Sequence, residues 1–477
     1  MAELFAKEKL IEMEEMLVGL GPRLTGSQPH IDYINFLEKE LISYGYEIGE
    51  DDNVFNKWEP KDYSLNYESN EGNIIEVDKN DISYYPYSGQ TEEEGVTAPM
   101  KWCGKEPINS FMGSLNKIAV VSMPIFEADC GLVFKKREVY PSDFIPPQKQ
   151  GSPVVSTFVI APVLKHAKKA GAKAVICVMT GCSDDLARHQ YLPFITTYAG
   201  IPSLWVTESV GKEIIEAAQN GKNATLKLTA NYGKDAHSRT IYAVLKGQNP
   251  NQSILVNTHT DGSNAFEENA GIGLLSLAKY FSEKPIEERN RNLVFSFVTG
   301  HFQLHQFGNA LNQATTRFLN VHPEFWDGEA GNYQAIAGLT MEHLGCSEWR
   351  DDEKHENFIK LDDTDPELVY TSNEIMSRMY IDCIKDRKYV KALMLRPKNM
   401  VHFGEGQPIY KKGIPSISLC PGPDYLCNVA PNGYIDKINY DMMAEQIDTF
   451  RKLIELLDTK KREELGFKQK FNFGIKF

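Results

Sequence analysis

Acidic and histidine side chains follow several apolar segments of the sequence, at the points where strands are expected to end. Because the carboxyl ends of parallel strands form one rim of an open α/β sheet, residues placed there can meet in one site. The candidates are His259, Asp261, Glu267, Glu268, His301, Glu342, His343, Glu405 and Asp424.

Three of these residues have donor atoms suited to a hydrolytic metal ion. Such an ion needs two or three nitrogen or oxygen ligands from different strands and one position open to water. His259, Glu267 and Glu342 can provide the ligands. Each of the three taken alone is more often a solvated loop acid or a hydrogen-bonded core histidine. The metal site is therefore predicted from the set and not from any one member.

The segments that must position these residues alternate between strand and helix. Short apolar runs typical of buried strands occupy residues 253–257, 293–299, 336–341 and 414–419. Helices are expected over 271–281, where apolar residues recur along one side, and over 441–457. This alternation predicts an α/β domain with a mixed, mostly parallel sheet flanked by helices.

The remaining segments suggest a second, smaller domain. Helical spacing occupies 7–19 and 30–45, whereas 46–110 has no consistent period. From about 113 to 229, strands and helices alternate again, which predicts an inserted module. We assign 1–75 and 236–465 to the main domain, 110–230 to the inserted domain, 76–109 to a connection of unassigned structure and 466–477 to a C-terminal tail.

The composition excludes some classes of partner. The 477 residues are 42% hydrophobic and 24% charged, which is typical of a globular protein. The formal net charge is −14, so no excess of Lys and Arg is present to neutralise phosphates. We therefore expect no nucleic acid and no membrane as a partner, but a small-molecule or peptide-like substrate. Assembly into a homo-oligomer is left open.

The N-terminus and the cysteines favour a cytoplasmic location. The first residues enter a charged amphipathic pattern without the apolar core of a signal peptide. The eight cysteines include no Cys-x-x-Cys pair, and in such a chain they are best interpreted as reduced thiols.

Six short motifs recur near the ends of the expected elements: Gly21 to Ser27, Asn257 to Asp261, Glu267 to Gly271, Gly300-His301, Gly413 to Ile417 and Asp436 to Ile438. Together they resemble the leucyl aminopeptidase/glutamate carboxypeptidase family of co-catalytic zinc exopeptidases, which includes glutaminyl cyclase. The inserted module is similar to a protease-associated domain. The resemblance implies a zinc exopeptidase-like fold over most of the chain.

The resemblance implies roles for the strand-end residues. In the family one metal is held by a histidine, a bridging carboxylate and a later acid, and the matching positions are His259, Glu267 and Glu342. Asp261 matches the acid that orients the ligand imidazole.

Both ligands private to the family's second metal are missing. Phe302 stands where the family has a ligand glutamate, and no histidine lies between Ser418 and Asp436. The sequence therefore predicts a rebuilt site with one divalent metal, Zn²⁺ first, with Mn²⁺ or Fe²⁺ as alternatives.

The family's general-base glutamate matches His301. An imidazole titrates near ~6.5 and can move protons at neutral pH. We expect an apolar wall beside Phe302 to keep His301 neutral, as a base must be. Alternatively, His301 is a further metal ligand.

These residues predict a metal-dependent hydrolase acting on an amide or peptide-like bond, with His301 and Asp261 in catalytic roles. Two alternatives remain: a non-catalytic binding protein on a peptidase fold, or a one-metal lyase or cyclase. In the inserted module, Tyr191 and the pair Asp184-Asp185 are candidates for shaping the substrate cleft.

Overall fold

The structure is a computed structural model. It describes residues 2–106, 108–154, 156, 162–193, 196–303, 313–398 and 401–466. Apart from residue 466, the predicted C-terminal tail lies outside the described residues.

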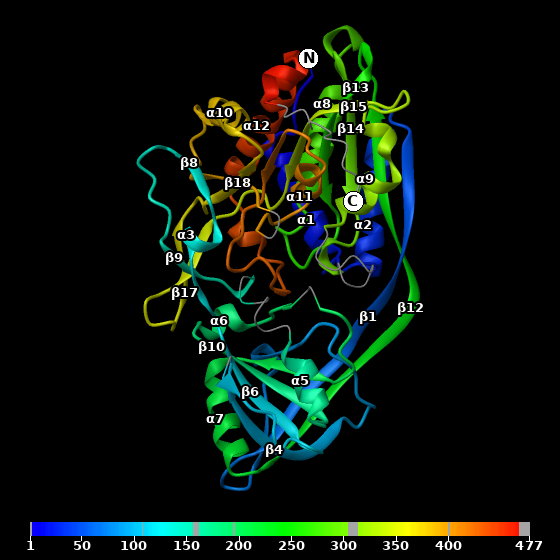
Figure 1. Cartoon of the computed structure of the whole chain (residues 1–477). Coiled ribbons are helices and arrows are strands. Elements are labelled where there is room, and N and C mark those ends of the chain that lie inside the picture. Colours follow the sequence, from blue (N-terminus) through cyan, green and yellow to red (C-terminus); the bar gives the residue numbers. More distant parts are fainter. Residues whose placement is uncertain are drawn as a thin grey trace, which may run out of the picture.

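Strands and helices alternate along most of the described chain (Figure 1). The strands are β1 Ile48–Glu68, β2 Ile74–Glu76, β3 Ile82–Tyr84, β4 Val96–Lys105, β5 Ile108–Asn109, β6 Ile118–Pro124, β7 Glu127–Asp129, β8 Lys136–Tyr140, β9 Lys149–Gly151, β10 Ala174–Thr180, β11 Ser203–Val206, β12 Asn223–Leu245, β13 Asn249–His259, β14 Arg291–Val298, β15 Gln334–Met341, β16 Glu348–Asp351, β17 Phe358–Asp362, β18 Glu367–Thr371, β19 Ala392–Leu395 and β20 Ser416–Leu419. The helices are α1 Lys7–Gly19, α2 Gln28–Ser43, α3 Cys130–Val133, α5 Val163–Lys169, α6 Asp184–Ala187, α7 Glu208–Gln219, α8 Ala270–Ser282, α9 Thr315–Val321, α10 Glu374–Ile384, α11 Gly406–Lys411 and α12 Tyr440–Thr459.

Four parallel strands form the centre of the main sheet, in the order β14-β13-β15-β20. From Ser253 onwards in β13, and over nearly all of the other three strands, the residues are buried on both faces, as expected where helices cover both sides of a parallel sheet. Antiparallel strands flank them, β12 beside β14 and β18 beside β20. The predicted α/β class with a mixed, mostly parallel sheet flanked by helices is confirmed.

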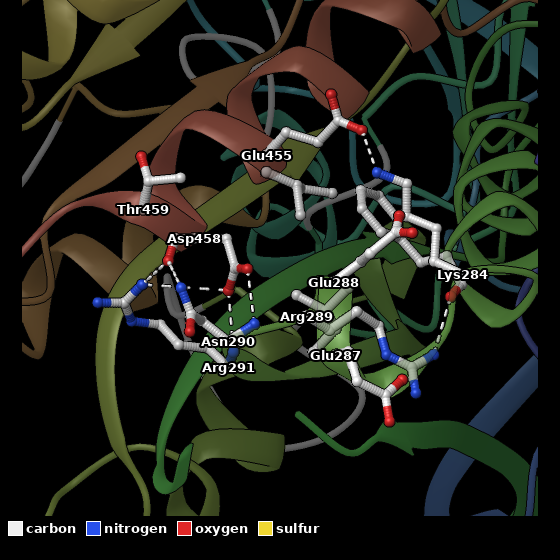
Figure 2. A pocket seen from close by; sticks show the side chains of 12 residues that line it. Lys284, Glu287, Glu288, Arg289, Asn290, Arg291, Glu455, Asp458 and Thr459 are labelled. Atoms are coloured by element: carbon white, nitrogen blue, oxygen red, sulfur yellow. Dashed lines mark hydrogen bonds and ion pairs between the residues drawn. The ribbon is translucent and has the colours of Figure 1, made fainter. Parts of the chain in front are cut away.

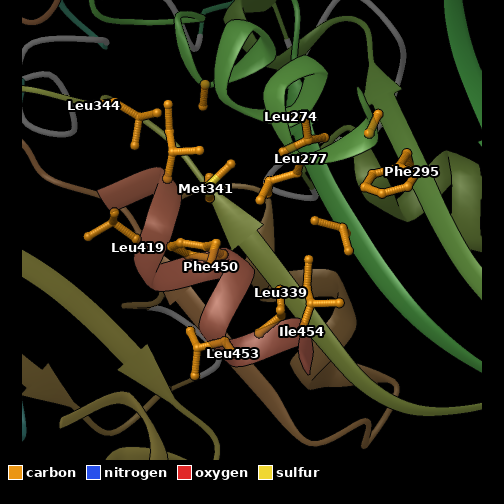
Figure 3. Close-up of a cluster of buried hydrophobic side chains, with 14 of the residues drawn as sticks. Leu274, Leu277, Phe295, Leu339, Met341, Leu344, Leu419, Phe450, Leu453 and Ile454 are labelled. Atoms are coloured by element: carbon orange, nitrogen blue, oxygen red, sulfur yellow. The ribbon is translucent and has the colours of Figure 1, made fainter. Parts of the chain in front are cut away.

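Alternate residues of the central strands pack into two separate cores. Ile254 and Val256 of β13 join α1, α2, α8, α10 and α12 on one face, whereas Leu255 joins α9 and α11 on the other. This is the two-residue period of a strand. Figure 3 shows the larger core, where Phe450 and Leu453 of α12 meet side chains of α8 and β15.

Two long strands connect the main part of the molecule, built around β13, β14, β15 and β20, to a smaller part built around β4, β6, β10 and β11 (Figure 1). β1 and β12 pair antiparallel from Ile48–Ala243 to Tyr67–Ala224. One end of β12 also pairs with β14 of the main sheet, and the other end pairs with β4. The hydrogen-bonded sheet is therefore continuous between the two parts, through strands that belong to both.

The smaller part has apolar cores of its own, on the two faces of β6 and β10. Its segment β8 nevertheless pairs with β19 at the far edge of the main sheet. The predicted domain boundaries and the protease-associated assignment stay predictions, because shared strands mark no single boundary.

The described residues of region 46–110, in which apolar residues follow no consistent period, are largely extended. β1 alone is 21 residues long, and its burial alternates only in part. Many of its polar residues lie on a half-exposed surface, so the strand depends on its pairing with β12, which lies far away in the sequence.

Among the described residues, no helix is long and apolar enough to cross a membrane.

Candidate metal centre

Three predicted site residues lie at the ends of adjacent parallel strands. His259 is the last residue of β13, Glu342 directly follows β15, and His301 follows β14 by three residues. Because β13 lies between β14 and β15, the three ends are neighbours at one rim of the sheet.

The side chains of His259, His301 and Glu342 form a group that could hold a metal ion. One ligand atom from each lies within 4.8 Å of the others. The two imidazole rings are stacked with centroids 4.0 Å apart, and His259 Nε2 lies 3.7 Å from Glu342 Oε2. All three residues are buried.

The His259 imidazole is oriented by the main chain. Its Nδ1 lies 3.0 Å from the carbonyl oxygen of Asp261, while its buried Nε2 has no hydrogen-bond partner among the described residues. Burial, aided by the charges of His301 and His343, lowers the pKa of His259 well below 6.5. The neutral ring therefore turns a lone pair towards the group.

The His301 imidazole is held by a carboxylate. Its Nδ1 lies 2.6 Å from Glu405 Oε1. Burial alone would lower the pKa of His301, but the hydrogen bond and charge of Glu405 raise it to about 10. The expectation that apolar surroundings keep His301 neutral is therefore wrong for the metal-free protein, because an acid from another segment faces the ring.

Glu405 is itself fixed by several bonds. Its carboxylate accepts the backbone N–H groups of Ala314 (3.1 Å) and Thr315 (2.6 Å) at the start of α9. Its own backbone N–H donates to Glu342 Oε1 at 2.6 Å. Burial raises the pKa of Glu342 to about 7, against the effect of the nearby histidines. Glu405 thus connects two members of the group.

Glu267, the third predicted ligand, lies outside this group. Its Oε2 is 3.0 Å from His343 Nε2, and His343 Nδ1 is 2.6 Å from the carbonyl oxygen of Pro421. The His343 ring lies 6.0 Å from that of His259. Burial would lower the pKa of His343, but Glu267 raises it. A second acid–imidazole pair therefore lies beside the first group.

The Asp261 carboxylate organises the turn that carries His301. It accepts the backbone N–H groups of Gly300 (3.1 Å), His301 (3.3 Å) and Phe302 (3.0 Å), and the hydroxyl of Thr25 at 2.6 Å. The carboxylate thus contacts the His301 backbone, whereas His259 is held by the Asp261 carbonyl oxygen.

The other strand-end acids have structural partners. Glu268 forms a buried ion pair with Arg23. Asp424 lies 3.6 Å from Arg350. Sequence reasoning named His343 and Glu405 as candidates but gave them no role, because their partners lie 76 and 104 residues away.

The chemistry of the donor set fits a divalent metal. Both histidines bond to the protein through Nδ1, as is usual for metal-ligating histidines, and Nε2 of His259 has no hydrogen-bond partner among the described residues. Two imidazoles and one carboxylate are a common set for catalytic zinc.

An aromatic pair lies directly beside the site. Phe302 is fully buried and stacks on Tyr191 of the smaller part, with ring centroids 5.1 Å apart. Tyr191 also accepts a hydrogen bond from Gln303 Nε2 at 3.0 Å. The smaller part therefore supplies a wall next to the candidate centre.

The cavity in Figure 2 lies elsewhere. Its volume is about 350 Å³, and its walls include Lys284, Arg291 and Asp458. Arg291 begins β14, whereas the candidate centre lies past the other end of that strand. The polar groups in this cavity are largely paired, for example Lys284 with Glu455 at 2.6 Å.

The fold, a mixed and mostly parallel sheet flanked by helices, matches the fold of solved peptidase structures. No protein-family model matches the chain, and no curated protein matches it.

Three solved structures are similar over almost the whole chain. Peptidase M28 precursor from Shewanella amazonensis has a TM-score of 0.64 at 13% identity, covering 95% of this chain and 96% of that one. The zinc aminopeptidase BSAP from Bacillus subtilis has a TM-score of 0.61 at 17% identity, covering 96% and 98%. An aminopeptidase from Aneurinibacillus has a TM-score of 0.58 at 16% identity, covering 95% and 93%. At these identities the likeness shows the fold alone.

Proposed function

We propose that this protein is a metal-dependent hydrolase of an amide or peptide-like bond, with one divalent ion held by His259, His301 and Glu342. The observation that carries the proposal is the convergence of these three buried side chains, with His259 Nε2 left unpaired among the described residues. The aminopeptidase names of the similar structures support the choice of reaction.

The bound ion would supply Lewis-acid activation of water and of the substrate carbonyl. Zn²⁺ suits the donor set best, with Mn²⁺ or Fe²⁺ as alternatives. The Glu405 carboxylate orients the His301 ring by its contact with His301 Nδ1. The carbonyl oxygen of Asp261 orients the His259 ring in the same way, by its contact with His259 Nδ1. These bonds hold both rings in position before an ion binds.

Glu267 is the proposed proton acceptor. Its carboxylate oxygens make no hydrogen bond to the described residues apart from the 3.0 Å ion pair with His343 Nε2. It would take a proton from the attacking water and return it to the leaving amine, while His343 holds its Oε2. In the alternative assignment, Glu267 is a ligand and His301 is the base.

Burial of the site favours a second candidate function. His259 and Glu342 are fully buried, so a closed site with a structural ion would give a non-catalytic binding protein on the same fold. Metal content and turnover together separate the two functions.

The test is elemental analysis of the purified protein with hydrolysis assays on peptide amides. We expect about one equivalent of metal and measurable turnover. His301→Gln should remove the metal if His301 is a ligand. If the variant instead keeps the metal and loses ~100-fold in turnover, His301 is the base. Metal without turnover supports the binding protein, and a wild type that takes up no metal contradicts the proposal.

The matched control is His322→Gln. His322 is also a buried histidine between carboxylates, 2.9 Å from Asp51 and 2.7 Å from Glu324, but it lies at the end of α9 away from the group. This variant should keep the metal and the turnover.

A further inference from the structure

A small pocket lies between the two parts of the molecule, next to the candidate centre. Its volume is about 20 Å³, and its walls include Thr25, Lys57, Trp58, Tyr87, Tyr191 and Gln303. Gln303 is two residues beyond His301, and Thr25 donates to Asp261. The pocket is therefore adjacent to the turn that carries His301.

The walls of the pocket are held rigidly. Trp58 donates through Nε1 to the carbonyl oxygen of Gly89 at 3.1 Å, and its ring lies 5.8 Å from that of Tyr87. Tyr191 stacks on Phe302, and the backbone N–H of Tyr191 donates to the backbone carbonyl oxygen of Cys427 at 3.0 Å. A rigid wall selects by shape, because it does not yield to a larger group.

One polar side chain in the wall has unused hydrogen-bonding capacity. Gln303 is 2% exposed, its Nε2 donates to the Tyr191 hydroxyl, and its Oε1 has no partner among the described residues. A buried acceptor without a partner costs free energy, so a ligand that donates to it gains affinity. The Tyr191 hydroxyl, which accepts from Gln303, still has its own hydrogen to donate.

The pocket offers no unpaired cation among its described walls, because Lys57 lies 3.1 Å from Glu59. The pocket volume of about 20 Å³ is close to the roughly 10–15 Å³ of cavity space that one water molecule needs. The occupant is therefore limited to about one non-hydrogen atom. We propose that this pocket is a substrate subsite for a small uncharged group that donates and accepts hydrogen bonds, such as a hydroxyl. The inference rests on the proposed function.

The test uses p-nitroanilides of alanine, serine, 2,3-diaminopropionic acid and leucine with the metal-loaded protein. At the position beyond Cβ, these side chains offer the subsite only a hydrogen, a hydroxyl, an ammonium or a bulky apolar group. We expect kcat/KM for serine to exceed that for alanine by about 10-fold or more, with the other two below serine. A preference for leucine or for the ammonium substrate overturns the proposal.

The variant Gln303→Leu removes the acceptor with little change in volume. The serine-to-alanine ratio of kcat/KM should fall to about one, because a leucine side chain cannot accept a hydrogen bond from the serine hydroxyl. Tyr84→Phe is the control, since Tyr84 packs against Tyr191 with ring centroids 5.8 Å apart but is not a wall of the pocket. An unchanged ratio in Gln303→Leu refutes the subsite.

A binding measurement tests the pocket even if the protein is not a hydrolase. If the wild type hydrolyses none of the substrates, binding of serinamide and alaninamide is compared by saturation-transfer NMR. Preferential binding of serinamide that Gln303→Leu abolishes supports the pocket without hydrolysis. Equal binding of the two amides overturns it.

Discussion

Two neighbouring histidines of the candidate centre differ in what holds them. A main-chain carbonyl fixes His259 and burial keeps it neutral, whereas Glu405 fixes His301 and favours its charged form. A metal ion would have to displace a proton from His301 but not from His259. Metal affinity should therefore fall as the pH falls, with His301 as the main cause.

Glu405→Gln tests the origin of the His301 charge in the metal-free protein. The pKa of His301 is raised to about 10 in the folded protein, whereas a histidine in the unfolded chain titrates near ~6.5. The charged His301 therefore contributes fully to the free energy of unfolding below about pH 6.5, and this contribution is lost as the pH rises to about 10. Without the Glu405 charge and hydrogen bond, the pKa of His301 should fall, because burial lowers it and only the weaker effects of Glu342 and Glu267 still raise it. NMR titration of the imidazole measures this, and an unchanged pKa near 10 would show that another group holds the proton.

Gly404→Ala tests how tightly the group is packed. Gly404 has φ +78°, and an added Cβ would meet Glu342 Oε2 at 2.6 Å and Cys420 Sγ at 2.8 Å. We expect loss of metal binding in addition to a backbone cost of about 1–2 kcal/mol. Gly413→Ala is a matched control, since Gly413 has the same φ and open space around its Cβ position. If both variants bind metal equally well, the contact with Glu342 is unimportant.

At the scale of elements, the ends of β14, β13 and β15 set the spacing of the group. Parallel neighbours end side by side, so one ligand from each strand end is enough to bring three side chains together. The start of α9 contributes as well, because its backbone N–H groups hold the Glu405 carboxylate.

Helix α12 stabilises these strands from one face (Figure 3). Phe450 is fully buried in the main core, so Phe450→Ala should lower the free energy of unfolding by about 3–5 kcal/mol. Leu456 of the same helix is only partly buried, and Leu456→Ala should cost about 1 kcal/mol. Urea titration followed by circular dichroism measures both. Equal losses would mean that α12 is not packed as described.

At the scale of the whole molecule, β1 and β12 join the main and smaller parts through one continuous ladder (Figure 1). Separation of the parts would break that ladder and the stack of Tyr191 on Phe302. The centre and its wall are therefore built from both parts.

We expect both parts to unfold in one transition for this reason. Phe450→Ala, although located in the main core, should speed amide hydrogen exchange in β10 of the smaller part as well. Exchange measured by mass spectrometry tests this. Two calorimetric transitions, with β10 unaffected by the substitution, would show that the parts unfold independently.

The α/β class and the strands that end at or just before His259, His301 and Glu342 follow from the pattern of apolar residues, because this periodicity is a local property. The pairing of His301 with Glu405 and of Glu267 with His343 depends on tertiary packing, since these contacts join segments 104 and 76 residues apart. The same holds for β1, whose polar residues form a strand through pairing with β12. Side-chain partners and long-range strand pairs depend on how distant segments pack together. The spacing of residues within one segment therefore cannot predict them.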